Sequence, residues 1–195
     1  MNINVLQPNL SEKNETSAPL DGRVLQKNHI NRDSLWHVEE ENLFLKSEEK
    51  ARKDIVNQYK NDILSIALND TIESGHVAMS EQYIYQTVNE YNLEYIKEAA
   101  NELYLEWYND SQVLSSILIM MGSLSYDKAF PQGQTMAIEL LQHEDVALRD
   151  RAIQAFERWN SKKGLEVLQK LKCDRHWLQM YVDKVISYIE RDGLD

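Results

Sequence analysis

The sequence contains few residues that interrupt helices or cross-link a chain. Its 195 residues include only six glycines, three prolines and one cysteine, Cys173. So little glycine and proline disfavours a turn-rich β architecture, and the abundance of Leu, Ile, Glu and Gln favours helix. A single cysteine excludes an internal disulfide framework, and Cys173 has no partner at metal-site spacing. We therefore predict an all-α fold.

Long apolar runs are also absent. The most apolar stretch, residues 113–121, is interrupted by Ser115 and Ser116, which leaves no run of about 18 apolar residues to span a membrane. The beginning of the chain, MNINVLQPNLSEKNET, has neither the basic start nor the apolar core of a secretory signal. Together with the single cysteine, these absences predict a cytoplasmic protein without a membrane partner.

The short motifs of common enzyme classes are missing too. The sequence contains no Gly-rich phosphate loop, no His-Glu-x-x-His, no Cys-x-x-Cys and no Gly-x-Ser-x-Gly. The histidines never lie three or four residues apart. Cys173 and His176 lie three residues apart, a spacing that could pair a nucleophile with its base, but no oxyanion donors can be assigned to them. We therefore predict no catalytic residue, no cofactor and no metal ligand.

One helical frame recurs in the second half of the chain. It has the form Asp-x-x-apolar-x-x-x-apolar-x-x-x-apolar, which puts the three apolar residues on one helix face. Its members are Asp145 with Leu148, Ala152 and Phe156, Asp110 with Val113, Ile117 and Met121, and Asp174 with Trp177, Tyr181 and Val185. In the first of these, Asp145 is expected to cap the helix and Trp159 to extend its apolar face. Off that face, on the side expected to be solvated, lie Arg149, Arg151, Gln154 and Arg158.

Each frame follows another apolar helical segment. Two helices in every thirty-odd residues is the signature of an α-solenoid, whose units stack because none can bury its apolar face alone. The segment TMAIELLQHEDVALRDRAIQAFERW, residues 135–159, resembles a HEAT repeat, in which Arg149 matches an arginine near the start of the second helix. Leu114 and Leu178 occupy the corresponding positions in the neighbouring units. The resemblance, over roughly the last hundred residues, implies a short right-handed α-solenoid that binds macromolecules.

The N-terminal part of the chain has a different composition. Residues 1–33 contain too few apolar groups to offset the entropy of ordering, which predicts a flexible or extended arm. A single helical repeat domain is expected over residues 34–195. It should begin with a short helix to Leu45 and a longer helix from about Ser47. The expected parts are capping helices at 34–91 and repeat units at about 92–124, 131–159 and 161–191.

The negative charge is concentrated in residues 76–130. This segment has eight acids and two bases, a net charge of −6 out of −11 for the whole chain. Four of its glutamates recur every four residues, which stacks them along one side of a helix where like charges repel by about 1 kcal/mol in total. The segment also holds seven of the ten tyrosines, and Tyr and Trp are typical interface anchors.

This acidic, Tyr-rich segment is the predicted contact with a partner. The residues assigned to it are Glu94, Glu98, Glu102, Glu106, Tyr95, Tyr104, Tyr108 and Trp107. The alternative is that the rings fill the core and the glutamates only solvate the surface. The charge suits a protein with a basic surface and disfavours nucleic acid, since neutralising phosphates requires clustered cations and nearby acids offset Arg149, Arg151 and Arg158.

These observations favour a non-enzymatic protein-binding module. In its concrete form it is an acidic immunity- or antitoxin-type inhibitor that covers the basic site of a toxin. An accessory or scaffold subunit tethered by the N-terminal arm is the alternative in the same class. Two further alternatives are a nucleic-acid mimic and, from a different class, an enzyme whose fold assembles a site from His143, Asp145 and His176. The oligomeric state does not follow from the sequence.

Overall fold

The computed structural model describes residues 32–72 and 76–195, with side chains from Glu40 onward. Of the predicted arm, residues 1–33, the part up to residue 31 therefore lies outside the described residues, and residues 32 and 33 belong to the first helix. The chain divides into two units, Met1–Asn42 and Leu43–Asp195. Of the first unit, the structure describes only the beginning of the first helix, residues 32–42.

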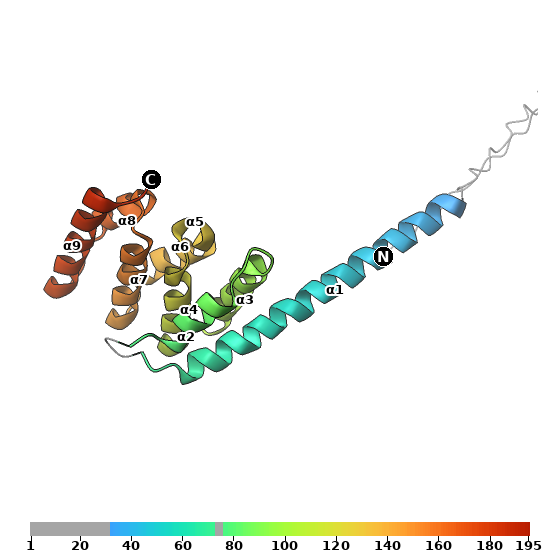
Figure 1. The fold of residues 1–195 in the computed structure, drawn as a ribbon, viewed down its shortest axis with the longest axis horizontal. Helices are drawn as coiled ribbons and strands as arrows, with labels where there is room; N and C mark the ends of the chain where they lie inside the picture. The colour runs from blue at the N-terminus through green and yellow to red at the C-terminus, as the bar shows by residue number, and fades with distance from the viewer. Residues whose placement is uncertain (1–31, 73–75) are drawn as a thin grey trace, which may run out of the picture. The chain divides into compact units, whose positions relative to one another are not determined.

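Every regular element within the described residues is a helix (Figure 1), which confirms the all-α prediction. The α-helices are α1 (Arg32–Asn69), α2 (Met79–Thr87), α3 (Leu93–Glu106), α4 (Ser111–Ser123), α5 (Tyr126–Ala129), α6 (Gln132–Leu140), α7 (Val146–Trp159), α8 (Leu165–Lys170) and α9 (His176–Asp192). A short 3₁₀ helix, η1 (Lys162–Gly164), precedes α8. Within the described ranges, no helix combines the length and the apolar character that a membrane span requires.

Helix α1 is continuous where the sequence predicted two helices. No glycine or proline interrupts residues 32–69. Ser47, which was expected to begin the second helix, donates its hydroxyl to the carbonyl oxygen of Phe44 at 2.7 Å. A serine in the interior of a helix commonly bonds back to the preceding turn in this way, so the residue does not mark a boundary.

Helices α2 to α9 pack as two rows within the unit Leu43–Asp195. In one row α2, α4, α7 and α9 follow one another side by side, and in the other α3 packs against α6 (Figure 1). Consecutive helices connect the rows, because α3 packs on α4, α6 on α7 and α8 on α9. Helix α4 has neighbours on all sides, and every residue from Val113 to Gly122 is buried.

The predicted apolar face of α7 is confirmed. Leu148, Ala152, Phe156 and Trp159 are all buried. The frame at Asp174 differs, because Trp177 is 51% exposed and Leu178 is buried in its place. Helix α9 begins only at His176, and as the last helix of its row it has α7 on one side and no helix beyond it within the described residues.

The frame aspartates also differ in their contacts. The Asp145 carboxylate accepts a hydrogen bond from the backbone N–H of Ala147 at 2.9 Å, which confirms the predicted cap. Asp110 caps α4 in the same way through the N–H groups of Gln112 and Val113, each at 3.0 Å. Asp174 does not cap α9, since the N-cap position belongs to Arg175.

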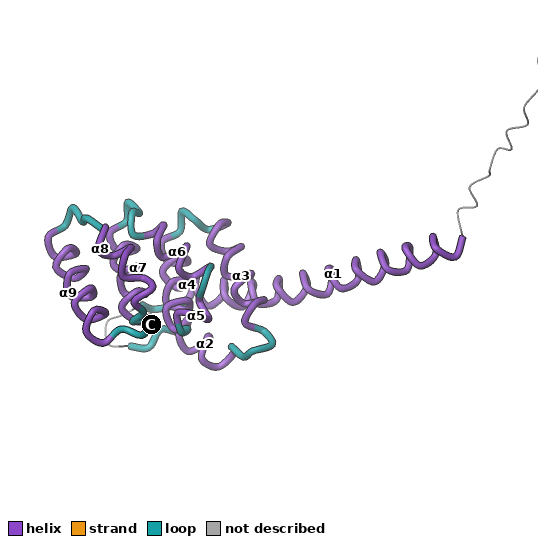
Figure 2. The backbone as a smooth tube through the Cα atoms, turned by 90° about the horizontal axis from the view of Figure 1, so that it is seen from above, coloured by secondary structure: helices purple, strands orange, loops and turns teal. Residues whose placement is uncertain are grey.

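Asp174 instead joins two neighbouring loops. Arg149 donates to its carboxylate at 3.0 Å and to the carbonyl oxygen of His143 at 3.2 Å. On the other side, Asp145 is hydrogen-bonded to Ser111. The loops that connect α3 to α4, α6 to α7 and α8 to α9 lie along one edge (Figure 2), so these side chains link each loop to the next.

Candidate functional site

Three of the four glutamates of the predicted contact face the C-terminal half of α1. Arg52 donates to the Glu98 carboxylate at 2.5 Å. Lys60 donates to Glu102 at 3.1 Å and also to Glu106. These ion pairs place cations beside the carboxylates, which offsets the like-charge repulsion expected along α3. The glutamate stripe therefore helps to hold α3 against α1.

Glu94, the first glutamate of the stripe, is paired within α3. Its carboxylate accepts a hydrogen bond at 3.0 Å from Lys97, which is 4% exposed. The Lys97 ammonium also donates to the carbonyl oxygen of Phe130 at 2.9 Å. A buried ammonium needs such partners, because its charge is otherwise strongly destabilised away from water. Glu94 thus contributes to the burial of Lys97.

The aromatic residues of the predicted contact lie in or against the core. Tyr104 is 3% exposed and meets Tyr108 edge to face, with ring centroids 5.7 Å apart. Tyr95, Trp107 and Tyr108 are partly buried and pack against the core. In this arrangement the rings contribute apolar contact area to the fold. Six of the eight predicted residues thus lie on α3, with Trp107 as its C-cap and Tyr108 in the turn that follows, but the eight do not form an open aromatic surface.

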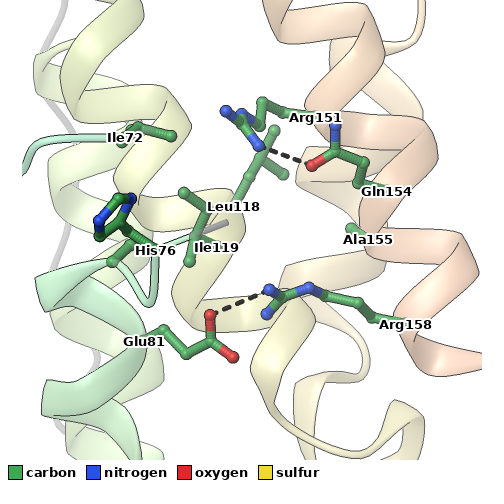
Figure 3. A pocket seen from close by; sticks show the side chains of 10 residues that line it. Ile72, His76, Glu81, Leu118, Ile119, Arg151, Gln154, Ala155 and Arg158 are labelled. Atoms are coloured by element: carbon green, nitrogen blue, oxygen red, sulfur yellow. Dashed lines mark hydrogen bonds and ion pairs between the residues drawn. The ribbon is translucent and has the colours of Figure 1, made fainter. Parts of the chain in front are cut away.

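A groove that differs in chemistry from the acidic side of α3 lies between α2 and α7, next to α4. Leu118 and Ile119 of α4 and Ala155 of α7 supply apolar surface, and polar side chains flank it (Figure 3). The polar residues that line it are His76, Glu81, Arg151, Gln154 and Arg158. None of the eight predicted contact residues lines this groove.

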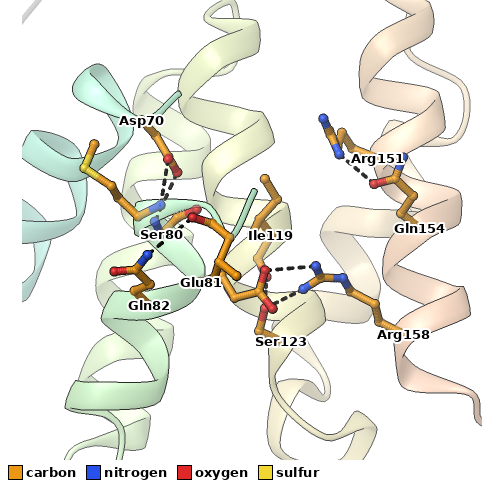
Figure 4. Close-up of polar contacts among 11 residues, drawn as sticks. Asp70, Ser80, Glu81, Gln82, Ile119, Ser123, Arg151, Gln154 and Arg158 are labelled. Atoms are coloured by element: carbon orange, nitrogen blue, oxygen red, sulfur yellow. Dashed lines mark hydrogen bonds and ion pairs between the residues drawn. The ribbon is translucent and has the colours of Figure 1, made fainter. Parts of the chain in front are cut away.

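Two arginines of α7 extend into the groove. Arg158 donates to the Glu81 carboxylate at 2.9 Å and to the hydroxyl of Ser123 at 2.8 Å (Figure 4). Arg151, two helical turns earlier, donates to the amide oxygen of Gln154 at 2.7 Å. Within the described residues, Arg158 thus has a carboxylate partner, whereas Arg151 has a neutral amide as its hydrogen-bond acceptor.

Gln154 is itself held in place. Its amide nitrogen donates to the Asp150 carboxylate at 2.7 Å, which leaves the amide oxygen to accept from Arg151. Burial raises the pKa of Asp150, while the positive charge of Arg151 opposes that shift. This chain of hydrogen bonds fixes the guanidinium of Arg151 relative to α7.

The opposite side of the groove is positioned by Asp70, which lies just after α1. Its buried carboxylate accepts hydrogen bonds from the backbone N–H groups of Met79 at 2.8 Å and Ser80 at 3.1 Å (Figure 4). It thereby caps α2 from nine residues upstream, where the N-cap residue Ala78 has no side-chain acceptor. Glu81 follows in the first turn of the helix that this cap fixes.

A close approach of α4 and α7 forms the base of the groove. A Cβ atom on Gly122 would lie 3.3 Å from the Cα atom of Ala155, so glycine and alanine let the two helices pack tightly. The space between the lining side chains measures about 50 Å³, and a second hollow of about 450 Å³ shares Glu81 and Arg158 with it. The smaller volume suits a small group such as the tip of a side chain, since ligand pockets usually occupy several hundred Å³.

Neither a family model, nor a characterised protein, nor a solved structure matches the chain.

Sequence reasoning assigned the groove arginines to the solvated side of α7. The signal that could have found them is their spacing, since Arg151, Gln154 and Arg158 at i, i+3 and i+7 share one helix face. What the sequence did not reveal is that α2 lies opposite this face. That placement depends on the Asp70 cap, which joins residues nine and ten positions apart.

Two of the three residues considered for an enzyme site, His143 and Asp145, have structural contacts. Nδ1 of His143 accepts a hydrogen bond from the backbone N–H of Asp145 at 3.0 Å, and Asp145 caps α7. Over the described ranges, no group of three or more His, Cys, Asp or Glu side chains is placed to hold a metal ion. Burial raises the pKa of the Cys173 thiol, which disfavours the nucleophilic thiolate.

Proposed function

We propose that this chain is a non-enzymatic protein-binding module, built as a short right-handed α-solenoid of HEAT-like units, whose groove between α2 and α7 contacts the partner. The groove carries this proposal, because it sets two arginines and an amide around an apolar base. Contacts of this kind, with an apolar centre and an arginine beside it, are typical of energetically important positions in protein interfaces.

The arrangement of the helices supports the solenoid part of the proposal. Consecutive pairs α3–α4, α6–α7 and α8–α9 pack in order, and their loops share one edge (Figure 2). The pair of Arg149 with Asp174 joins the loops of the last two pairs. A stack in which each unit contacts only its neighbours is the physical basis of solenoid stability.

The expected partner remains a protein with a basic surface, but the main contact moves from α3 to the groove between α2 and α7. The α3 carboxylates at Glu98, Glu102 and Glu106 are already engaged by α1, so their use by a partner would require Arg52 and Lys60 to separate from them. The net charge of −11 still attracts a protein with a basic surface at long range. Such a partner fits an immunity-type inhibitor, and an accessory subunit is the alternative.

The proposal is tested by blocking the groove. Gln154→Trp places a large ring beside Arg151, and Gln169→Trp makes the same change at an exposed position of α8 as the control. Tagged full-length variants are used to capture partners from an extract of the source cells, and the captured protein is then purified for titration by calorimetry. We expect binding by the wild type and Gln169→Trp and its loss in Gln154→Trp. Equal binding by all three would overturn the proposal.

A further inference from the structure

We propose that the groove receives one acidic side chain of the partner protein, Asp or Glu, with the guanidinium of Arg151 as its main contact. This inference rests on the proposed function and names the chemistry that the groove recognises. Its starting point is a positioned arginine, Arg151, whose printed hydrogen-bond acceptor is a neutral amide oxygen.

Among the described residues that line the groove, two arginines accompany one carboxylate. Glu81 balances Arg158 at 2.9 Å, and it is the single carboxylate among the described residues that line the groove. Arg151 offers five N–H donors, of which one meets the neutral amide oxygen of Gln154. Its remaining donors can bind a carboxylate in the two-pronged geometry that arginine favours.

The position of Arg151 is set before any partner arrives. Gln154 accepts from Arg151 at 2.7 Å (Figure 3) and donates to Asp150 at 2.7 Å, so the three side chains form one chain along α7. Asp150 does not line the groove, and it holds Gln154 from behind. A pre-positioned guanidinium loses less conformational entropy on binding, which strengthens the contact.

Size and donor geometry favour a carboxylate over a phosphate. The N–H donors that Arg151 does not direct to Gln154 belong to one planar guanidinium, which matches the two oxygens of one carboxylate. A phosphate monoester carries nearly two charges and three strong acceptor oxygens, more than this set of donors satisfies. The apolar residues Leu118 and Ile119 also suit the methylene groups of an Asp or Glu side chain.

The test uses the full-length chain and defined probes in NMR titrations at constant ionic strength. The probes are N-acetylated hexaglutamate, N-acetylated hexaglutamine and inorganic phosphate. The Nε–H resonances of the arginines report directly on guanidinium contacts. Arg175 is the internal control, because its side chain is 64% exposed and its neighbour Asp174 is its partner.

We expect hexaglutamate to shift the Arg151 and Arg158 resonances saturably, with Arg175 changing far less. Hexaglutamine should leave all three unchanged. Arg151→Gln should weaken hexaglutamate binding about tenfold, as expected for the loss of a charge-assisted hydrogen bond. Arg175→Gln should leave the affinity within about twofold of the wild type.

Three outcomes would overturn the inference. They are no saturable shift with hexaglutamate, an equal loss of affinity in Arg151→Gln and Arg175→Gln, or a tighter response to phosphate than to hexaglutamate. These outcomes are separable from failure of the proposed function. If a captured partner is lost in Gln154→Trp but binds Arg151→Gln as tightly as the wild type, the protein-binding groove stands and its acidic occupant does not.

Discussion

Arg158 of α7 and Glu81 of α2 form an ion pair at 2.9 Å between residues 77 positions apart in the sequence. The Glu81 side chain is 15% exposed and that of Arg158 is 42% exposed, so the pair lies at the border between solvent and protein. It connects α2 to α7, the two helices that flank α4 in the row. The relative position of the two sides of the groove depends in part on this contact.

The first prediction concerns the coupling between these two residues. In a double-mutant cycle with Glu81→Gln and Arg158→Gln, we expect a coupling free energy of about 0.5 kcal/mol, because the pair is half exposed. The measurement is urea unfolding of the four proteins. The control cycle uses Glu166→Gln and Lys170→Gln, whose side chains are 79% and 73% exposed. The control gives the coupling of a largely exposed ion pair, and a coupling of zero for Glu81 and Arg158 would show that these two residues act independently.

The second prediction concerns Lys60, whose ammonium lies between two glutamates of α3. Lys60→Met should destabilise the fold by about 1 kcal/mol, because it removes two hydrogen bonds to charged groups and leaves Glu102 and Glu106 without their cation. The control is Lys53→Met on the same helix, whose side chain is 71% exposed and pairs with Glu49. Both variants are compared with the wild type by urea unfolding.

The contribution of Lys60 should also depend on pH. The hydrogen bond with Glu106 is the main cause of a raised pKa for Lys60, and burial opposes it. A raised pKa in the folded state means that the stabilisation is complete below the ordinary value of 10.5 and is lost as the pH rises through the higher folded value. The difference between wild type and Lys60→Met should therefore be constant near neutral pH and shrink above 10.5. A constant difference throughout would contradict this assignment.

Helix content and the apolar faces could be predicted from the sequence because both depend on local spacing. The face with Leu148, Ala152 and Phe156 follows from a period of 3.6 residues, and Asp145 is recognisable as a cap because its acceptor lies within two residues of the donor. The frame at Asp174 was misplaced by one residue. There Arg149, 25 residues away, engages the carboxylate that would have capped α9.

The candidate site could not be predicted in the same way, because its contacts are long-range. The Glu98 and Glu102 stripe is plain in the sequence, but the cations that pair with it lie 46 and 42 residues upstream in α1. Single-chain periodicity shows which residues share a face and does not show what that face meets. For the same reason, Arg151 and Arg158 were assigned to solvent.

The third prediction concerns the cap at Asp145. Asp145→Ala should cost about 1 kcal/mol at neutral pH, because it removes the acceptor for the N–H of Ala147. The hydrogen bond with Ser111 and then that with Ala147 lower the pKa of Asp145. A lowered pKa means that the stabilisation is complete above the ordinary value of 3.8 and is lost as the pH falls through the lower folded value. Urea unfolding at about pH 7 and pH 3 should therefore show a smaller cost of Asp145→Ala at the lower pH.

The matched variant for this test is Asp145→Asn, which keeps a side-chain acceptor without the charge. It should cost less than Asp145→Ala at neutral pH, because asparagine is also a good N-cap residue. If both variants lose the same free energy at both pH values, the contribution of Asp145 comes from packing and not from its carboxylate.

The last prediction concerns Gly164, the final residue of η1, which approaches the buried ring of Phe156. A Cβ atom at Gly164 would lie 2.7 Å from Cδ1 and 2.9 Å from Cε1 of that ring, which is closer than packed carbon atoms approach. Gly164→Ala should therefore destabilise the fold by about 1–3 kcal/mol through overpacking. In a Phe156→Leu background the same substitution should cost less, because the smaller side chain leaves room for the new methyl group. Thermal and urea unfolding of the four proteins measure this coupling, and an equal cost in both backgrounds would mean that the ring is not what restricts residue 164 to glycine.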